Sequence, residues 1–277
     1  MKKIKKLFVL AAFLAAGASL FGQGKYSGGN GDGFSSITYL SYLSSGSLVK
    51  FRGGDGDGYA GISGEFVWYV IARVHLWLEG PYTAGVGMRT DLQTGGPIPT
   101  TSPYTDARES DPVPAGVTDW VLVELRGADG TTVRSYRSFF LKSNGSLVDT
   151  DGSTVNCRMP GVGDGDYYIA IKHRNHLAVM SAAEQTLNHT SASLLDFSTG
   201  ASQYSGGDAK LLETGVYGMY AGDTDVSGTI DASDRSATWN DRNQSGYLDA
   251  DCDLSGTVEA NDRSITWNNR NKTTSVP

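Results

Sequence analysis

The sequence predicts a mainly β protein, an antiparallel β-sandwich followed by a small C-terminal module of paired loop–helix repeats. Three observations lead to this fold class. Residues 66–79 alternate apolar and polar side chains, short apolar runs between turns follow at 119–172, and an acidic 12-residue pattern occurs twice after residue 222. The 277 residues include 36 glycines and 14 tyrosines, a composition that favours strands and turns over long helices.

The clearest strand pattern runs from residue 66 to residue 79. One parity is apolar at every position: Phe66, Trp68, Val70, Ala72, Val74, Leu76 and Leu78. The other parity carries Arg73, His75 and Glu79, so one face of this strand is expected to meet the core and the other to meet solvent. Fourteen residues is long for one strand, and we expect a bulge or a break to divide it.

Shorter apolar runs predict further strands at 119–126, 133–141 and 166–172, each bounded by turn residues. Residues 80–114 are rich in Gly, Pro, Thr and Ser and predict a long loop. Residues 181–187 predict one short helix. Strands do not alternate with long helical segments, so an α/β enzyme fold is not expected.

The N-terminus has the pattern of an export signal. Four lysines precede an apolar run at 7–16, and small residues allow cleavage after Ala18 or Gly22. The apolar run has half of the about 20 residues that a membrane-spanning helix needs. We therefore assign 1–22 to a signal peptide. We expect an exported, extracellular or cell-surface protein whose mature chain does not span a membrane.

Three further segments follow the signal. Residues 23–64 contain two glycine-rich copies, SGGNGDGF and RGGDGDGY, which begin 25 residues apart and each place an aromatic residue after a turn. Their role is left open by the sequence. Residues 65–218 form the predicted β-sandwich domain, and residues 219–277 form the C-terminal module.

Charge excludes some classes of partner. Removal of the signal and its four lysines leaves 19 basic against 30 acidic residues, a net charge of −11. Nucleic acids and anionic membranes are bound by clustered Lys and Arg, so neither is expected as a partner. Two cysteines, Cys157 and Cys252, are too few for a disulfide scaffold, and export permits their pairing without requiring it.

The C-terminal module contains the 12-residue pattern at 223–234 and again at 251–262. Oxygen-bearing side chains occupy positions 1, 3, 5, 9 and 12, glycine occupies position 6, and position 7 offers its carbonyl. Ca²⁺ takes six to eight oxygen ligands at about 2.3–2.6 Å, and such a loop wraps them around one ion. We therefore predict two calcium ions with these ligands: Asp223, Asp225, Ser227, Thr229, Asp231, Asp234, Asp251, Asp253, Ser255, Thr257, Glu259 and Asp262.

Each loop leads into a matching segment of nine residues. We expect a short helix that begins near position 10 and turns Trp239 or Trp267 towards the other repeat. Position 8 is Ile230 in one copy and Val258 in the other, as expected for loops that pair side by side. Ten of the 30 acidic residues lie at 223–262, so we expect calcium removal to unfold this module and to leave the β-domain folded.

The C-terminal module resembles the type I dockerin-like tail of exported bacterial proteins. The domain before it resembles a β-domain of unassigned function that precedes such tails in surface proteins. Three segments carry this second resemblance: LEGPY (78–82), DWVLVELR (119–126) and HRNHLAVM (173–180). The resemblance implies calcium binding and, for true dockerins, docking onto cohesin domains through loop positions 10 and 11. Those positions are Ala232-Ser233 and Ala260-Asn261, and the two pairs differ, which weighs against a cohesin partner.

No residue stands in a recognisable catalytic motif. The chain has no Gly-x-Ser-x-Gly, His-Glu-x-x-His or phosphate loop. His173 continues the core-facing parity of its strand, which indicates a structural role, and His176 is expected beyond the strand end.

We therefore predict a non-catalytic protein with a structural or adhesive role, whose partner is another surface protein or an extracellular polysaccharide. One alternative is a carbohydrate-binding module in which Trp68, Trp77 or tyrosines stack on sugars. Another is a secreted hydrolase that uses paired carboxylates.

Overall fold

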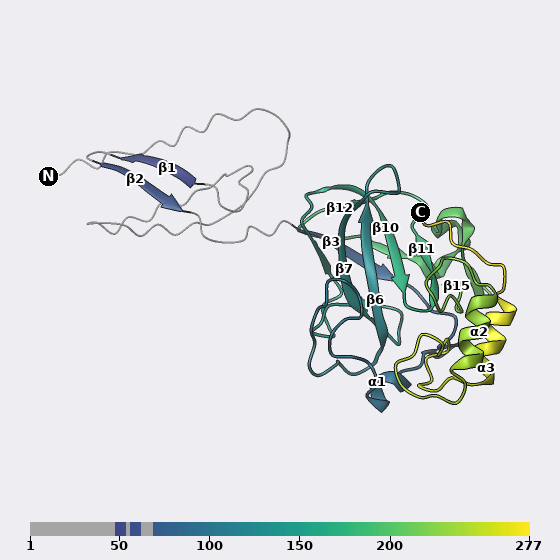
Figure 1. Cartoon of the computed structure of the whole chain (residues 1–277). Helices are drawn as coiled ribbons and strands as arrows, with labels where there is room; N and C mark the ends of the chain where they lie inside the picture. Colours follow the sequence, from purple (N-terminus) through teal and green to yellow (C-terminus); the bar gives the residue numbers. More distant parts are fainter. Residues whose placement is uncertain (1–47, 54–55, 62–68) are drawn as a thin grey trace. The chain divides into compact units, whose positions relative to one another are not determined.

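The computed structural model describes residues 48–53, 56–61 and 69–277. They belong to two units, one ending at Trp68 and the other running from Tyr69 to Pro277. In the first unit, β1 (Leu48–Gly53) pairs antiparallel with β2 (Gly56–Gly61) (Figure 1). The predicted signal peptide lies outside the described residues, as do most of the glycine-rich region and the side chains of Phe66 and Trp68.

The second unit contains two main sheets (Figure 1). The larger sheet has the order β11-β10-β6-β7-β8, with β12 paired to β10, and all its pairs are antiparallel. Its strands are β6 (Val117–Arg126), β7 (Val133–Lys142), β8 (Leu147–Val148), β10 (Gly165–His173), β11 (His176–Met180) and β12 (Gln185–Leu187). The smaller sheet has the order β13-β3-β9, with β13 (Leu194–Asp196), β3 (Tyr69–His75) and β9 (Cys157–Pro160).

The two sheets share one hydrophobic core, which contains Val70 and Val74 of β3 together with Trp120, Val121 and Phe139 of the larger sheet. The described part of the chain is therefore mainly β with few helices, and its second unit is a sandwich. One pair departs from the expected antiparallel pattern, because β13 lies parallel to β3.

The period-two prediction for residues 66–79 is confirmed over its described part. Val70 and Ala72 are fully buried and Arg73 is exposed. The strand ends at His75, which is the expected break, yet Leu76 and Leu78 remain fully buried beyond it. Every second residue therefore remains buried in the core for a few positions after the strand has ended.

The strands predicted at 119–126, 133–141 and 166–172 are confirmed as β6, β7 and β10. The helix predicted at 181–187 is wrong, because β12 pairs with the first residues of β10 there. Seven residues form too few helical hydrogen bonds to offset the cost of nucleation, whereas an existing strand edge provides partners at once.

Short elements fill the connections between the strands. The predicted loop at 80–114 contains the hairpin of β4 (Tyr82–Thr83) and β5 (Gly87–Met88) and one turn of helix, α1 (Asp91–Gly95). After β13 follow three 3₁₀ turns and a hairpin: η1 (Phe197–Thr199), η2 (Ala201–Gln203), η3 (Ser205–Gly207), β14 (Lys210–Glu213) and β15 (Val216–Gly218).

The C-terminal module consists of two loops and two helices, α2 (Ala232–Asn240) and α3 (Ala260–Asn268), which lie side by side (Figure 1). Both helices begin at loop position 10, as predicted. The chain enters the module along β11, where the amide of Leu177 donates to the carbonyl of Tyr220 and Gly222 donates to Asn175. Within the described residues, no helix is both long and apolar enough to cross a membrane.

Candidate functional site

The two acidic loops fold around the carboxylate at position 1. Asp223 accepts the backbone N–H groups of Ser227 (3.0 Å) and Gly228 (3.1 Å), and Asp251 accepts those of Ser255 (3.0 Å) and Gly256 (2.8 Å). The glycines at position 6 have φ of +83° and +88°, a conformation that costs glycine nothing and other residues about 1 kcal/mol or more. The repeated sequence therefore produces the same loop twice.

The carboxylate at position 12 joins each loop to its helix. Asp234 accepts the N–H of Asp231 (2.7 Å) and the N–H of Thr224 (2.7 Å), so one side chain fixes both the helix start and the loop start. Asp262 does the same with Glu259 (2.7 Å) and Asp253 (3.1 Å). These bonds satisfy amides that a helix N-terminus leaves without partners.

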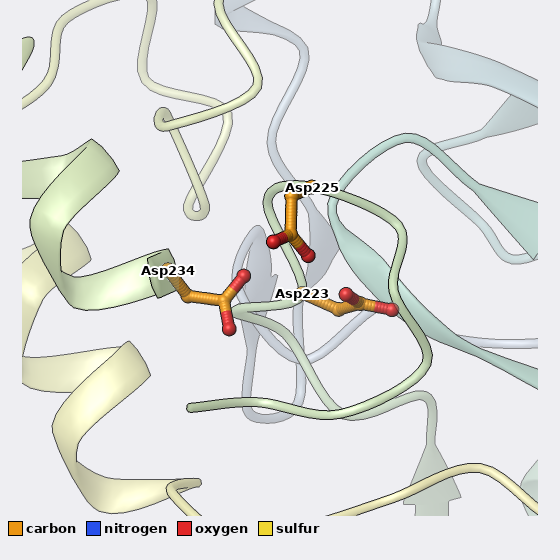
Figure 2. A group of neighbouring side chains, drawn as sticks. All are labelled: Asp223, Asp225 and Asp234. Carbon is orange, nitrogen blue, oxygen red and sulfur yellow. The ribbon is translucent and has the colours of Figure 1, made fainter. Parts of the chain in front are cut away.

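The carboxylates of positions 1, 3 and 12 converge in each loop. Ligand oxygens of Asp223, Asp225 and Asp234 lie within 4.8 Å of one another, and the same holds for Asp251, Asp253 and Asp262. Figure 2 shows Asp234 on the first turn of α2 and the other two on the loop beside it. Three carboxylates so close together are a ligand set for a hard divalent cation.

The other predicted ligands lie around this cluster. The hydroxyl of Ser227 donates to the carbonyl of Thr229 (3.1 Å), and Ser255 donates to Thr257 (3.0 Å). Asp231 accepts the N–H of Ser233 (2.6 Å) at the N-terminus of α2. The exposed Glu259 occupies the equivalent place at α3. The hydroxyl of Ser255 also donates to Asp251 Oδ1 (3.4 Å), so position 5 of the second loop reaches its carboxylate cluster, whereas Asp231 and Glu259 at position 9 are not among the three clustered carboxylates of either loop.

The pKa values of the clustered carboxyl groups respond to this crowding. Burial, followed by repulsion from Asp234, raises the pKa of Asp223 to about 6. In the second loop, burial and neighbouring carboxylates raise the pKa of Asp251 to about 7 and that of Asp262 to about 6. A buried cluster of like charges is unfavourable without a cation, so the residues present fit a bound Ca²⁺.

The two repeats are joined crosswise. Ile230 and Val258 at position 8 are fully buried, but they do not pair with each other as expected. Instead, Ile230 exchanges backbone hydrogen bonds with Asn271 and Lys272 after α3, and Val258 exchanges them with residues 243–244 after α2. Each loop is therefore held by the turn that follows the helix of the other repeat.

The tryptophan of each repeat contacts the other repeat, as expected, but it is not buried between α2 and α3. Trp239 is 51% exposed and Trp267 is 54% exposed, while the residues that α2 and α3 bury are Asp234, Thr238, Asp262 and Thr266. Two guanidinium groups lie over each indole ring, one from its own repeat and one from the other. Their distances to the ring centroid are 4.7 Å (Arg242) and 4.9 Å (Arg263) for Trp239, and 4.5 Å (Arg270) and 5.1 Å (Arg235) for Trp267.

A second polar cluster lies at the end of β10, inside the β-domain. Asp119 is fully buried and accepts hydrogen bonds from Arg174 Nε (3.0 Å), His173 Nε2 (3.3 Å) and the hydroxyl of Tyr247 (2.6 Å). Burial alone would raise the pKa of Asp119, but Arg174 and His173 lower it to about 2. The cluster is therefore a buried ion pair that connects the β-domain to Tyr247 of the C-terminal module, and it leaves Arg174 Nη2 and His176 Nε2 buried without a hydrogen-bond partner among the described residues.

His173 lies on the core side of β10, where its parity places it. A carboxylate only accepts, so the contact with Asp119 assigns the proton to Nε2 and leaves Nδ1 to accept from His176 Nδ1 (2.9 Å). His176 lies beyond the end of β10, as expected, but it begins the next strand, β11, and is 1% exposed. Burial lowers the pKa of both histidines, each of which is 1% exposed.

The segment between the two histidines contacts the second loop directly. The guanidinium of Arg174 donates to the carbonyl of Leu248, and the amide of Asn175 donates to the carbonyls of Asp249 (3.1 Å) and Asp251 (2.8 Å). No local motif marks Asn175 or Arg174 as contacts of an acidic loop more than seventy residues away, so sequence reasoning missed this role.

A hollow of about 300 Å³ lies beside this cluster and is lined by Pro103, Tyr104, Lys172, His173, Arg174, Val226 and Asp249. Most of its charged groups have partners, since Lys172 pairs with Glu124 (2.7 Å) and His173 and Arg174 pair with Asp119, but Arg174 Nη2 has no hydrogen-bond partner in the part of the chain that the structure describes. The two cysteines, Cys157 and Cys252, are both buried and free.

No family model matches this chain, and no curated protein is similar to it. Solved structures that match the chain include two complexes. Both are type II cohesin–X–dockerin complexes from Acetivibrio cellulolyticus, one with an N-terminal and one with a C-terminal interface mutation. The identity is 17% in each case, with TM-scores of 0.37 and 0.38. The alignments cover 73% of this chain and 97% and 96% of the matched chains. Similarity at this level assigns neither a family nor a function.

Proposed function

We propose that this chain is a non-catalytic, exported module that binds an acidic protein partner, and that two calcium ions stabilise its dockerin-like C-terminal module. The observation that carries the binding role is the repeated exposure of tryptophan and arginine on α2 and α3. The ligand geometry of the two loops supports the calcium ions.

Calcium suits the loops better than magnesium. Each loop offers carboxylate, hydroxyl and carbonyl oxygens spread over 12 residues, which matches the six to eight ligands of Ca²⁺. Magnesium prefers a small octahedron and retains several waters, so a long loop with many protein oxygens gains little from it. When bound, the ion neutralises the carboxylates that otherwise repel one another inside each loop.

Titration of the whole chain with calcium is expected to show two sites. Asp223→Ala should remove one site and Asp251→Ala the other, because each substitution deletes the carboxylate that organises its loop. Isothermal calorimetry of the three proteins gives the stoichiometry, with Asp166→Ala, an exposed aspartate of β10, as the control. If the whole chain binds no calcium, the assignment of the two loops as metal sites is wrong.

The exposed faces of α2 and α3 form what we call the Trp–Arg face: Trp239, Trp267, Arg235, Arg242, Arg263 and Arg270. Among the described residues, no carboxylate lies within ion-pair distance of these four guanidinium groups. The chain as a whole has a net charge of −7, so a face with four arginines and no paired carboxylate in the described part of the chain is a local region of positive charge on an acidic protein. Trp and Arg are also the residues most enriched at the energetic centres of protein interfaces. Charge complementarity therefore points to an acidic protein surface.

Selection of displayed peptides on the immobilised whole chain is expected to enrich sequences rich in Asp and Glu. The double substitution Trp239→Ala and Trp267→Ala should weaken binding of the selected peptides by about 30-fold or more, the effect of losing an interface hot spot. Arg242→Gln with Arg270→Gln should weaken it too and reduce its dependence on salt. Tyr136→Ala, which removes an exposed aromatic residue of β7, is the matched control in surface plasmon resonance.

The carbohydrate-binding alternative loses support from the packing of its aromatic candidates. Trp77 is half-buried between His75 (5.0 Å between ring centroids) and Tyr82 (5.2 Å), and Trp68 lies outside the described residues. The exposed rings of Trp239 and Trp267 already have guanidinium groups over them. A glycan array read with and without calcium is the decisive test, and strong binding of a neutral sugar would replace the protein partner with a polysaccharide.

A further inference from the structure

The two acidic loops have nearly the same sequence but different surroundings. Position 4 shows the contrast, since Val226 of the first loop is 56% exposed and Leu254 of the second is 1% exposed. Both residues have positive φ, of +54° and +57°, so the backbone is the same and only the packing differs. Leu254 belongs to the hydrophobic core of the β-domain, whereas Val226 meets solvent.

The carboxylates at position 3 also differ between the two loops, both in burial and in their charged neighbours. Asp225 is exposed, and among the described residues no basic side chain pairs with it. Asp253 is 3% exposed, and one of its carboxylate oxygens has two partners: Arg89 Nη1 at 3.5 Å from the β-domain and the side-chain amide of Asn261 at 2.6 Å from the same loop. Arg89 comes from the segment between β5 and α1, so the β-domain reaches into the ligand set of the second loop.

The backbone of the second loop is also enclosed. Asn175 donates to the carbonyl of Asp251 at 2.8 Å. Gly80 approaches the carbonyl of Cys252 so closely that a β-carbon at this position would lie 1.8 Å from that oxygen. Only glycine fits there, so the β-domain and the second loop touch along the backbone itself. Release of an ion from this loop therefore requires movement against the β-domain.

We propose that the two calcium sites are unequal: the second loop is a slowly exchanging site that closes the contact between the β-domain and the C-terminal module, with Arg89 setting its affinity, and the first loop is a freely exchanging site. The inference rests on the calcium binding proposed above. It assigns a role to Arg89, whose guanidinium places a positive charge beside a carboxylate ligand and so reduces the attraction of that loop for a cation.

Calcium release from the whole chain, followed by stopped-flow mixing with a fluorescent chelator, tests this assignment. We expect two phases of equal amplitude whose rates differ by at least about tenfold, because opening a packed element costs more than opening an exposed loop. Asp225→Ala should remove the fast phase alone, and Asp253→Ala should remove the slow phase alone.

Arg89→Gln is expected to raise calcium affinity at the slow site roughly tenfold in low salt, and less in high salt, where the half-exposed charge is screened. Asp91→Asn is the matched control, because it removes the other partner of Arg89 (3.0 Å) and leaves the guanidinium beside Asp253. Arg73→Gln controls for loss of a positive charge elsewhere on the surface.

The outcomes separate this inference from the calcium assignment. No bound calcium at all contradicts the proposed metal sites themselves. Two ions released in one phase, or an Arg89→Gln variant whose two sites are both unchanged, overturns the inequality and leaves the metal sites standing. Arg73→Gln having the same effect as Arg89→Gln also overturns it, since the effect then comes from net charge.

Discussion

Removal of calcium from the whole chain is expected to destabilise the entire unit Tyr69–Pro277 in one transition. Each ion bound only by the folded state adds about 2.7 kcal/mol at a hundredfold excess over its Kd, so two sites add roughly twice that amount. The second loop is held by Asn175 and packs Leu254 into the β-domain core, so its loss exposes β-domain surface as well. Chelation should therefore shift the melting of both parts together.

Near-ultraviolet circular dichroism gives one measurement of this coupling, because Trp120 is fully buried in the β-domain and reports on its core. Far-ultraviolet ellipticity reports on all elements, including α2 and α3. The two melting curves should coincide with calcium and move together without it. Asn175→Ala removes the hydrogen bonds from the side-chain amide to the carbonyls of Asp249 and Asp251. We expect the melting of the β-domain and that of the C-terminal module to separate into two transitions in this variant. If the C-terminal module of the wild-type chain melts alone after chelation, coupled melting is contradicted. The expectation from the charge distribution, that the β-domain stays folded without calcium, would then hold.

Asp119→Asn is expected to cost about 3–5 kcal/mol of stability, the usual effect of removing one partner of a buried ion pair. Asp119 is the carboxylate partner of Arg174, which is only 5% exposed. The double variant Asp119→Asn, Arg174→Met should cost less than the sum of the single changes, because it removes both charges. Chemical denaturation of the four proteins gives this coupling energy. Glu184→Gln, an exposed carboxylate before β12, should change stability little.

The pKa of Asp119 fixes the sign of the pH dependence. Its folded value of about 2 lies below the unfolded value of about 3.9, so the folded state holds the ionised form more strongly. The stabilisation is present above the unfolded pKa and is lost as the pH falls from about 4 through about 2. Acid unfolding of Asp119→Asn should lack this component. Equal acid sensitivity in both proteins would show that Asp119 does not carry it.

Local patterns were sufficient for much of the fold. The alternation in β3, the apolar run of β6 and the spacing of Asp223 to Asp234 depend on neighbours in the chain. The strands and the two helix starts agree with their predictions. The carboxylates of positions 1, 3 and 12 also come together as predicted. These features follow from backbone geometry that a short segment determines by itself.

The features that sequence reasoning missed all depend on contacts between distant segments. The burial of His176 was not expected, because nothing local shows that the chain returns along β10 as β11. The tryptophans were expected to turn towards the other repeat, but no local pattern shows that arginines of both repeats lie over their rings. Arg89 lies in a segment with no motif, more than 160 residues before Asp253, and only the packing of the C-terminal module against the β-domain brings the two together.

Because each loop forms hydrogen bonds with the other repeat, a single repeat of this module is not expected to fold alone. A single loop with its helix would leave the N–H and C=O of Ile230 without the turn at 271–272, and a single second copy would leave Val258 without the turn at 243–244. The present arrangement therefore works only as a pair. Two separate copies of one repeat would achieve the same closure by pairing with each other. A synthetic single repeat should therefore be sought as a dimer.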